Sequence, residues 1–222
     1  MTRNRWVSEL HWRREGQQTR SEKTQAALLD AAEALILEKG TEGTSIADIA
    51  NRAGSSVGAV YHHFKDKTAL YYALFHRMTD AYAQLNAEAS NPALWTDATV
   101  RDLFRGFLEI SLTAAQRTGA AKAAVSAVIA DHPALAAHYA EIQRETRKSL
   151  LKFVLERRDE IGRPDAEEAA AFAVDQCLAM VRAYLDPSQT AAKLQSLNDA
   201  QFIDRTVEMM ALFLRLPPAK SA

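Results

Sequence analysis

The sequence predicts an all-α protein of about nine helices, and three observations lead to that fold class. Glycine and proline are scarce, with eight and six among 222 residues, while alanine, leucine and glutamate, which favour helices, are frequent. Apolar residues recur at the three- and four-residue spacing of a buried helix face along most of the chain. No alternating run rich in valine, isoleucine and threonine is long enough to predict a strand.

Glycine, proline and capping residues predict where the longer helices begin and end. One helix is expected over residues 21–39, stopped by Gly40, and another opens at Asp66 as its cap. Farther along, breaks are expected at Asn91-Pro92, Gly119, His132-Pro133, Gly162 with Pro164, and Asp186-Pro187. The helices between these breaks are predicted at about 97–118, 120–130, 133–160, 165–184 and 199–214.

The stretch from Thr44 to Lys67 begins with a short predicted helix. Ser45 and Asp48 stand at the spacing of a capping box, so the hydroxyl and the carboxylate can each accept a hydrogen bond from an amide of the first turn. Gly54 ends the helix, where a left-handed residue is favoured. The apolar stripe of this helix consists of Ile46, Ile49, Ala50 and Ala53.

A second short helix must begin almost at once. Ser56 is a good N-cap, and Val60 and Phe64 fall four residues apart on a new apolar face. Two short helices joined by a glycine-centred turn form a helix-turn-helix. The second helix leaves its remaining residues largely outside the apolar face, and most of them are suited to meet DNA: Val57, Gly58, Ala59, Tyr61, His62 and His63.

The run from Ser21 to about Ala83 resembles the DNA-binding domain of the TetR family of bacterial transcriptional regulators. The segments that carry the resemblance are TSIADIA (44–50), AG (53–54) and GAVYHHFKDK (58–67). The resemblance implies a DNA-binding regulator, most often a ligand-responsive repressor, that binds a palindromic operator as a homodimer. It also implies three parts: a basic arm over 1–20, a helix-turn-helix domain over 21–83, and a helical ligand-binding and dimerisation domain over 84–218.

DNA contacts are expected from the helix-turn-helix and the lysines that follow it. Tyr61 and His62 are expected to donate to phosphates or base edges in the major groove, and Thr44 to offer its hydroxyl to a phosphate. The alternatives are that the aromatic side chains cover the next helix and that the lysines are merely solvated. The full predicted set is Thr44, Ser55, Ser56, Val57, Gly58, Ala59, Tyr61, His62, Lys65 and Lys67.

This sequence departs from the usual wording of the family at three of these positions. Val57 stands where a lysine or another polar residue is common, and Ala59 where a threonine is common. Ser55 replaces a frequent apolar residue. The two apolar replacements leave contact with thymine methyl groups as the specific interaction that we expect here.

Two further residue sets follow from the resemblance. The last two long helices are expected to pair two subunits, because the final helix is apolar almost all round and needs burial on more than one side. The predicted dimer residues are Phe172, Met180, Phe202, Met209 and Phe213. Residues that line an effector pocket, or else simply fill the core, are Phe104, Phe107, Val128, Tyr139, Met180 and Tyr184.

Other classes of protein find little support in the sequence. Cys177 lies in an apolar helical stripe and reads as an inert core thiol, and no metal-ligand spacing or phosphate loop occurs. We therefore expect no enzyme, no metal and no cofactor. A single cysteine, no long apolar run and no signal peptide predict a cytoplasmic protein outside the membrane.

The charge distribution leaves two questions open. Basic residues outnumber acidic ones six to three up to Lys23, although the whole chain has a net charge of −1. The arm over 1–20 either reaches phosphates or the minor groove, or is a tail docked by its tryptophans. The near-neutral total also allows an all-helical ligand- or partner-binding module that no longer binds DNA.

Overall fold

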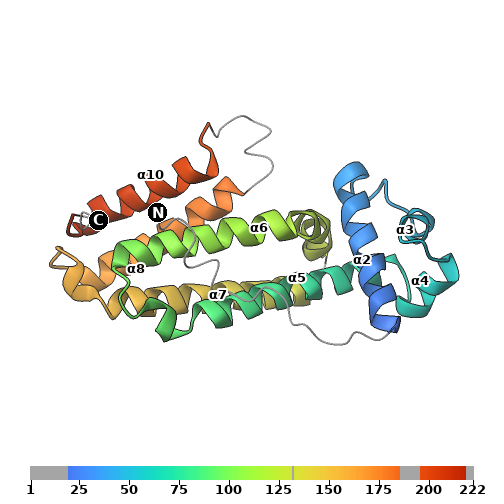
Figure 1. Cartoon of the computed structure of the whole chain (residues 1–222), viewed down its shortest axis with the longest axis horizontal. Helices are drawn as coiled ribbons and strands as arrows, with labels where there is room; N and C mark the ends of the chain where they lie inside the picture. Colours follow the sequence, from blue (N-terminus) through green and yellow to red (C-terminus); the bar gives the residue numbers. More distant parts are fainter. Residues whose placement is uncertain (1–19, 132, 186–195, 219–222) are drawn as a thin grey trace. The chain divides into compact units, whose positions relative to one another are not determined.

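The structure is a computed structural model that describes residues 20–131, 133–185 and 196–218. Within these residues there are eight α-helices, two short 3-10 helices and no strand, which confirms the predicted all-α class. Residues 1–19 of the expected arm and the expected break at Asp186-Pro187 lie outside them. The elements (Figure 1) are α2 (Arg20–Lys39), α3 (Ile46–Arg52), α4 (Val57–His63), α5 (Lys67–Ala89), η1 (Pro92–Trp95), α6 (Val100–Asp131), α7 (Pro133–Leu155), η2 (Arg158–Glu160), α8 (Ala166–Tyr184) and α10 (Asp199–Leu214).

The predicted break at Gly119 is wrong, because α6 runs without interruption from Val100 to Asp131. A glycine inside a helix costs only about 1 kcal/mol relative to alanine, and the alanine-rich sequence that follows favours the helix. The break before Pro133 does occur, and this proline starts α7, where its missing amide is tolerated. α7 ends at Leu155, earlier than expected, and η2 follows.

The chain divides into two compact units. The described residues of the first, here called the N-terminal unit, lie within 20–84 and 117–142. Those of the C-terminal unit lie within 85–116 and 143–218. The domain boundaries that the resemblance implies remain a prediction.

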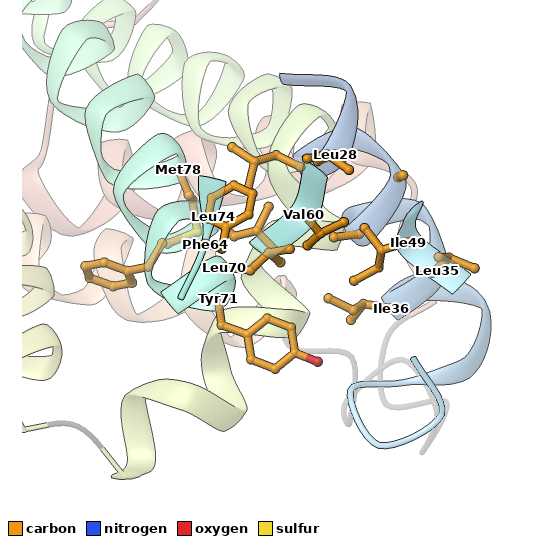
Figure 2. Packing of buried hydrophobic residues seen from close by; sticks show 14 of the residues in the cluster. Leu28, Leu35, Ile36, Ile49, Val60, Phe64, Leu70, Tyr71, Leu74 and Met78 are labelled. Atoms are coloured by element: carbon orange, nitrogen blue, oxygen red, sulfur yellow. The ribbon is translucent and has the colours of Figure 1, made fainter. Parts of the chain in front are cut away.

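The N-terminal unit is built around one apolar core (Figure 2). α4 contributes Val60, which is fully buried, and the residue that ends this helix, Phe64, is 4% exposed. Because α2, α3 and α5 all supply side chains to the same core, they hold α4 by its inner face. The core includes Leu28, Leu35, Ile36, Ile49, Leu70, Leu74 and Phe75.

In the C-terminal unit α8 and α10 lie side by side (Figure 1). Asn198 caps α10 as expected, with a capping box completed by Gln201. Cys177 is fully buried on α8, and its burial raises the pKa of the thiol to about 12, as suits an inert core residue. Among the described helices, none combines the length and the apolar character needed to cross a bilayer.

Two leucines on α2 test the location of the core. Leu28→Ala removes a fully buried side chain, so it should lower the free energy of unfolding by about 2–5 kcal/mol. Leu37→Ala, at a side chain that is 64% exposed, should lower it by less than about 0.5 kcal/mol. Urea denaturation measures both, and equal losses would contradict this core.

Candidate nucleic-acid interface

The capping box predicted at the start of α3 is confirmed. The Ser45 hydroxyl accepts from the Asp48 amide at 3.1 Å, and the Asp48 carboxylate accepts from the Ser45 amide at 3.2 Å. Lys39 lies 3.2 Å from the same carboxylate. The hydrogen bonds from Ser45, and then Lys39, lower the pKa of Asp48, so the carboxylate that holds this end of α3 stays ionised at neutral pH.

The turn between α3 and α4 forms as the sequence predicts. Gly54 has a φ of 61°, the left-handed conformation that glycine adopts without strain. The Ser55 amide donates to the Ala50 carbonyl at 2.9 Å and closes the end of α3. The Ser56 hydroxyl then accepts from the Ala59 amide at 3.1 Å and starts α4. The two helices are therefore joined by a turn with defined geometry.

The outer face of α4 is open to solvent. Tyr61 is 54% exposed and Val57 is 43% exposed, and Gly58 and His62 are exposed beside them. Ser55 and Ala59 are half-buried, whereas Ser56 and Lys65 are exposed. Most of the predicted DNA-contacting residues are thus exposed on or next to α4, and we call this set the α4 face: Ser56, Val57, Gly58, Tyr61, His62 and Lys65.

His63 differs from its neighbour on α4. It is half-buried, and its ring centre lies 6.2 Å from that of Phe64. The rings of His62 and His63 meet edge to face at 5.3 Å, with His62 on the solvent side. His63 therefore packs beside the core residue that ends α4.

The Thr44 side chain points into the protein. It is 1% exposed, and its hydroxyl donates to the Gly40 carbonyl at 2.8 Å. The hydroxyl is turned inward and closes the turn between α2 and α3. Its expected contact with a phosphate remains a prediction. The sequence places Thr44 next to the capping residue, and only the fold shows which way its hydroxyl faces.

Lys67 is also held by the protein. It is half-buried, its Nζ donates to the Thr41 carbonyl at 2.8 Å, and it lies 5.6 Å from the centre of the Tyr71 ring. The Tyr71 hydroxyl donates to the same carbonyl at 3.1 Å. No pattern in the sequence signals this polar contact at the tip of Tyr71.

Two arginines of the N-terminal unit are paired with acids. Arg52, at the end of α3, binds Glu38 at 2.6 Å, and this contact raises the pKa of Arg52 and lowers that of Glu38. Arg77 binds Asp30 at 2.7 Å and also contacts Glu33. Such exposed pairs add little stability. They do offset the positive charge of the two arginines, which would otherwise attract a polyanion.

The predicted effector residues are spread over the structure. Phe104 is fully buried, and Phe107 and Met180 are half-buried, all in the C-terminal unit. Tyr184 stacks on Phe202 at 4.0 Å. Tyr139 lies in the N-terminal unit beside its core. The side chain of Val128 is not among those that the structure describes.

A hollow of about 490 Å³ lies on α7. None of the predicted effector residues lines it; its lining is Arg147, Lys148, Leu151, Lys152, Leu155 and Glu156.

The predicted dimer residues fall into two groups. Phe172 and Met209 are 53% and 44% exposed, and the Phe172 ring centre lies 5.3 Å from that of Phe213. Phe202 is only 5% exposed, because it packs against Tyr184 inside its own chain. Leu212, which the prediction omits, is 73% exposed on α10. The apolar surface of α8 and α10, here called the α8/α10 face, thus consists of Phe172, Met180, Met209, Leu212 and Phe213.

The helix-turn-helix segment is similar in sequence to known proteins. Residues 28–74 match the family described as "Bacterial regulatory proteins, tetR family". The Transposon Tn10 TetC protein of Escherichia coli is 36% identical over 78 residues, covering 34% of this chain and 40% of that protein. The HTH-type transcriptional regulator TtgR of Pseudomonas putida is 35% identical over 65 residues, covering 29% of this chain and 31% of that protein. The matches span less than half the length of either relative.

The likeness in fold extends over more of the chain. A solved structure of a bacterial regulatory protein in the tetR family from Rhodococcus RHA1 matches with a TM-score of 0.62 and 21% identity. The match covers 90% of this chain and 100% of that one. The predicted resemblance to the TetR family is confirmed by sequence for residues 28–74. Over most of the chain, the match to the solved structure shows a common fold.

The start of α4 can be tested with two neighbouring serines. Ser56→Ala removes the hydroxyl that accepts from the Ala59 amide, and it should lower the free energy of unfolding by about 0.5–2 kcal/mol. Ser55→Ala leaves this cap in place and should cost less than about 0.5 kcal/mol. Thermal and urea unfolding provide the measurement; a larger loss for Ser55→Ala would show that α4 is capped differently.

Proposed function

We propose that this chain, whose residues 28–74 match the tetR family, is a DNA-binding transcriptional regulator that acts as a homodimeric, ligand-responsive repressor. The observation that carries the proposal is the α4 face. A helix of seven residues is fixed from inside by Val60 and Phe64, while Val57, Tyr61 and His62 remain in solvent. Such a helix suits insertion into the major groove of DNA.

The chemistry of the α4 face indicates how it reads DNA. The Tyr61 hydroxyl and the His62 ring donate to phosphate oxygens or base edges. Val57, an exposed apolar side chain, contacts the methyl group of thymine, since the major groove presents that methyl group on its surface. Lys65, exposed just beyond α4, neutralises a phosphate and contributes to affinity without reading sequence.

Two copies of the chain pair through the α8/α10 face. A protein of this size rarely leaves several large apolar side chains together in solvent unless a partner covers them. A two-fold pair places two α4 helices on a two-fold symmetric operator, with half-sites about 34–36 Å apart or a multiple of that distance.

The effector acts by preferring one conformation. A small molecule held by the C-terminal helices releases DNA only if it binds the non-binding conformation more tightly, because equal affinity for both shifts nothing. Coupling of about 1–3 kcal/mol is typical of such linkage. Phe104, Phe107 and Met180 are the lining residues that we propose within the C-terminal unit.

A second candidate function is a partner-binding module without affinity for DNA. The net charge of −1 and the pairing of Arg52 and Arg77 with acids favour it. Selection of binding sites from random DNA distinguishes the two functions. The regulator should enrich a two-fold symmetric motif whose half-site spacing gives the geometry of the pair. If the selection at moderate salt enriches no sequence over random DNA, the partner-binding module is the better description of the function.

Tyr61→Ala tests the α4 face directly. Loss of this exposed ring and hydroxyl should weaken binding to the selected DNA by about 1–3 kcal/mol, or roughly 5- to 150-fold. Leu37→Ala, at an exposed leucine on α2, should leave the affinity unchanged. Fluorescence anisotropy titration measures both, with circular dichroism as the check on folding. An unchanged affinity for Tyr61→Ala would remove this residue from the interface.

Leu212→Asp tests the α8/α10 face. A carboxylate at this exposed position would be desolvated in a dimer, so the dimer dissociation constant should rise by about tenfold or more. Leu197→Asp, at a leucine that is 40% exposed just before α10, is the matched control and should leave the dimer intact. Analytical ultracentrifugation measures both; an undisturbed dimer for Leu212→Asp would place the subunit contact elsewhere.

A further inference from the structure

The turn between α2 and α3, residues 40–44, has a tightly defined shape. Gly40 has a φ of 74°, in the left-handed region. A Cβ atom added to Gly43 would lie 2.4 Å from the Lys39 carbonyl oxygen, so only glycine fits there. The Thr44 hydroxyl donates to the Gly40 carbonyl at 2.8 Å. The turn that leads into α3 is therefore sterically restricted.

Two side chains from the first two turns of α5 meet this turn at a single atom. The Lys67 Nζ and the Tyr71 hydroxyl donate to the Thr41 carbonyl oxygen at 2.8 Å and 3.1 Å. A carbonyl oxygen has two lone pairs, which suit these two short contacts; the Thr44 amide is a third, longer donor to the same oxygen at 3.4 Å. In Figure 2 the Tyr71 ring leaves α5 on the side of the core where Ile36 lies. We call this arrangement the Thr41 latch.

Tyr71 is well suited to be a permanent donor. Its side chain is 8% exposed, and burial, with a smaller contribution from the Glu42 carboxylate, raises the pKa of its hydroxyl. The hydroxyl therefore keeps its proton at neutral pH. A hydrogen bond sheltered from water is also stronger than an exposed one.

We propose that Lys67 and Tyr71 are positioning residues that set the orientation of α4 for DNA, an inference that rests on the proposed function. α4 is joined to α3 at one end and to α5 at the other. The Thr41 latch ties the start of α5 to the turn that begins α3, so it closes a ring of contacts around α4. Apolar packing is not directional, whereas hydrogen bonds are, so the latch defines the angle at which the α4 face is presented.

Lys65 and Lys67, both predicted from the sequence to contact DNA, have different roles in this proposal. Lys65 is exposed and acts as a phosphate contact. Lys67 acts through the Thr41 carbonyl. Removing a phosphate contact lowers the slope of log K against log salt by about 0.9, whereas removing a positioning contact lowers affinity at every salt concentration and keeps the slope.

The experiment compares Tyr71→Phe, which removes one hydroxyl, and Lys67→Met with the matched control Lys65→Met. In the free full-length protein, hydrogen exchange reports on the Thr44 amide, which donates to the Thr41 carbonyl at 3.4 Å. Exchange in this turn should accelerate about 3- to 10-fold in Tyr71→Phe and Lys67→Met, as expected for a lost hydrogen bond, and should not change in Lys65→Met. Titration of the selected DNA across a salt series then gives affinity and slope.

For Tyr71→Phe and Lys67→Met we expect several-fold weaker DNA binding with an unchanged slope. For Lys65→Met we expect a slope smaller in magnitude by about 0.9 for each half-site, since each subunit of the pair loses one phosphate contact. A lower slope for Lys67→Met with unchanged exchange of the turn would overturn the proposal and make Lys67 a phosphate contact. Unchanged exchange in Tyr71→Phe would overturn the latch even if no DNA were bound. If wild type binds no DNA selectively while exchange accelerates, the latch stands as a structural contact and the proposed function fails.

Discussion

The burial of Val60 and Phe64 is the interaction on which the candidate interface depends. A helix as short as α4, with seven residues, is not stable alone, because the cost of the first turn exceeds the gain from so few hydrogen bonds. Its stability comes from packing these two side chains against α2, α3 and α5. Since only one face of α4 is used for packing, the opposite face is left for recognition. The same constraint explains why Tyr61, one residue after Val60, is half in solvent.

Polar contacts define the ends of the two short helices, where apolar packing gives no direction. The Ser45 and Asp48 capping box starts α3, and the Ser56 hydroxyl starts α4. These contacts satisfy amides that a helix cannot pair internally. The Thr41 carbonyl has a comparable role over a longer range, because its donors come from α5. In the proposed function, shape contributes more than net charge to DNA binding by the N-terminal unit, since Arg52 and Arg77 are already paired with acids.

Where the sequence prediction succeeded and where it failed follows from the range of the interactions involved. Capping by Ser45 and Ser56 and the left-handed Gly54 were predictable, because each depends on residues within about one helical turn. Gly119 misled the prediction, since the small intrinsic cost of a glycine does not break a helix within a favourable sequence. Phe202 was predicted to contact a second subunit, and no sequence signal pointed to its stacking on Tyr184, which is on another helix.

The sequence by itself determined the all-α class, the two short helices with their caps, and the residues that resemble the TetR family. These features are local, so periodicity and capping chemistry specify them. Only the tertiary structure decided that Thr44 faces inward, that Lys67 binds a carbonyl while Lys65 stays in solvent, and that Tyr71 joins α5 to the turn before α3. The Lys67 and Tyr71 donors lie 26 and 30 residues from the carbonyl that they share. Contacts over such distances in sequence exist only after the helices have packed, because packing alone brings donor and acceptor within reach.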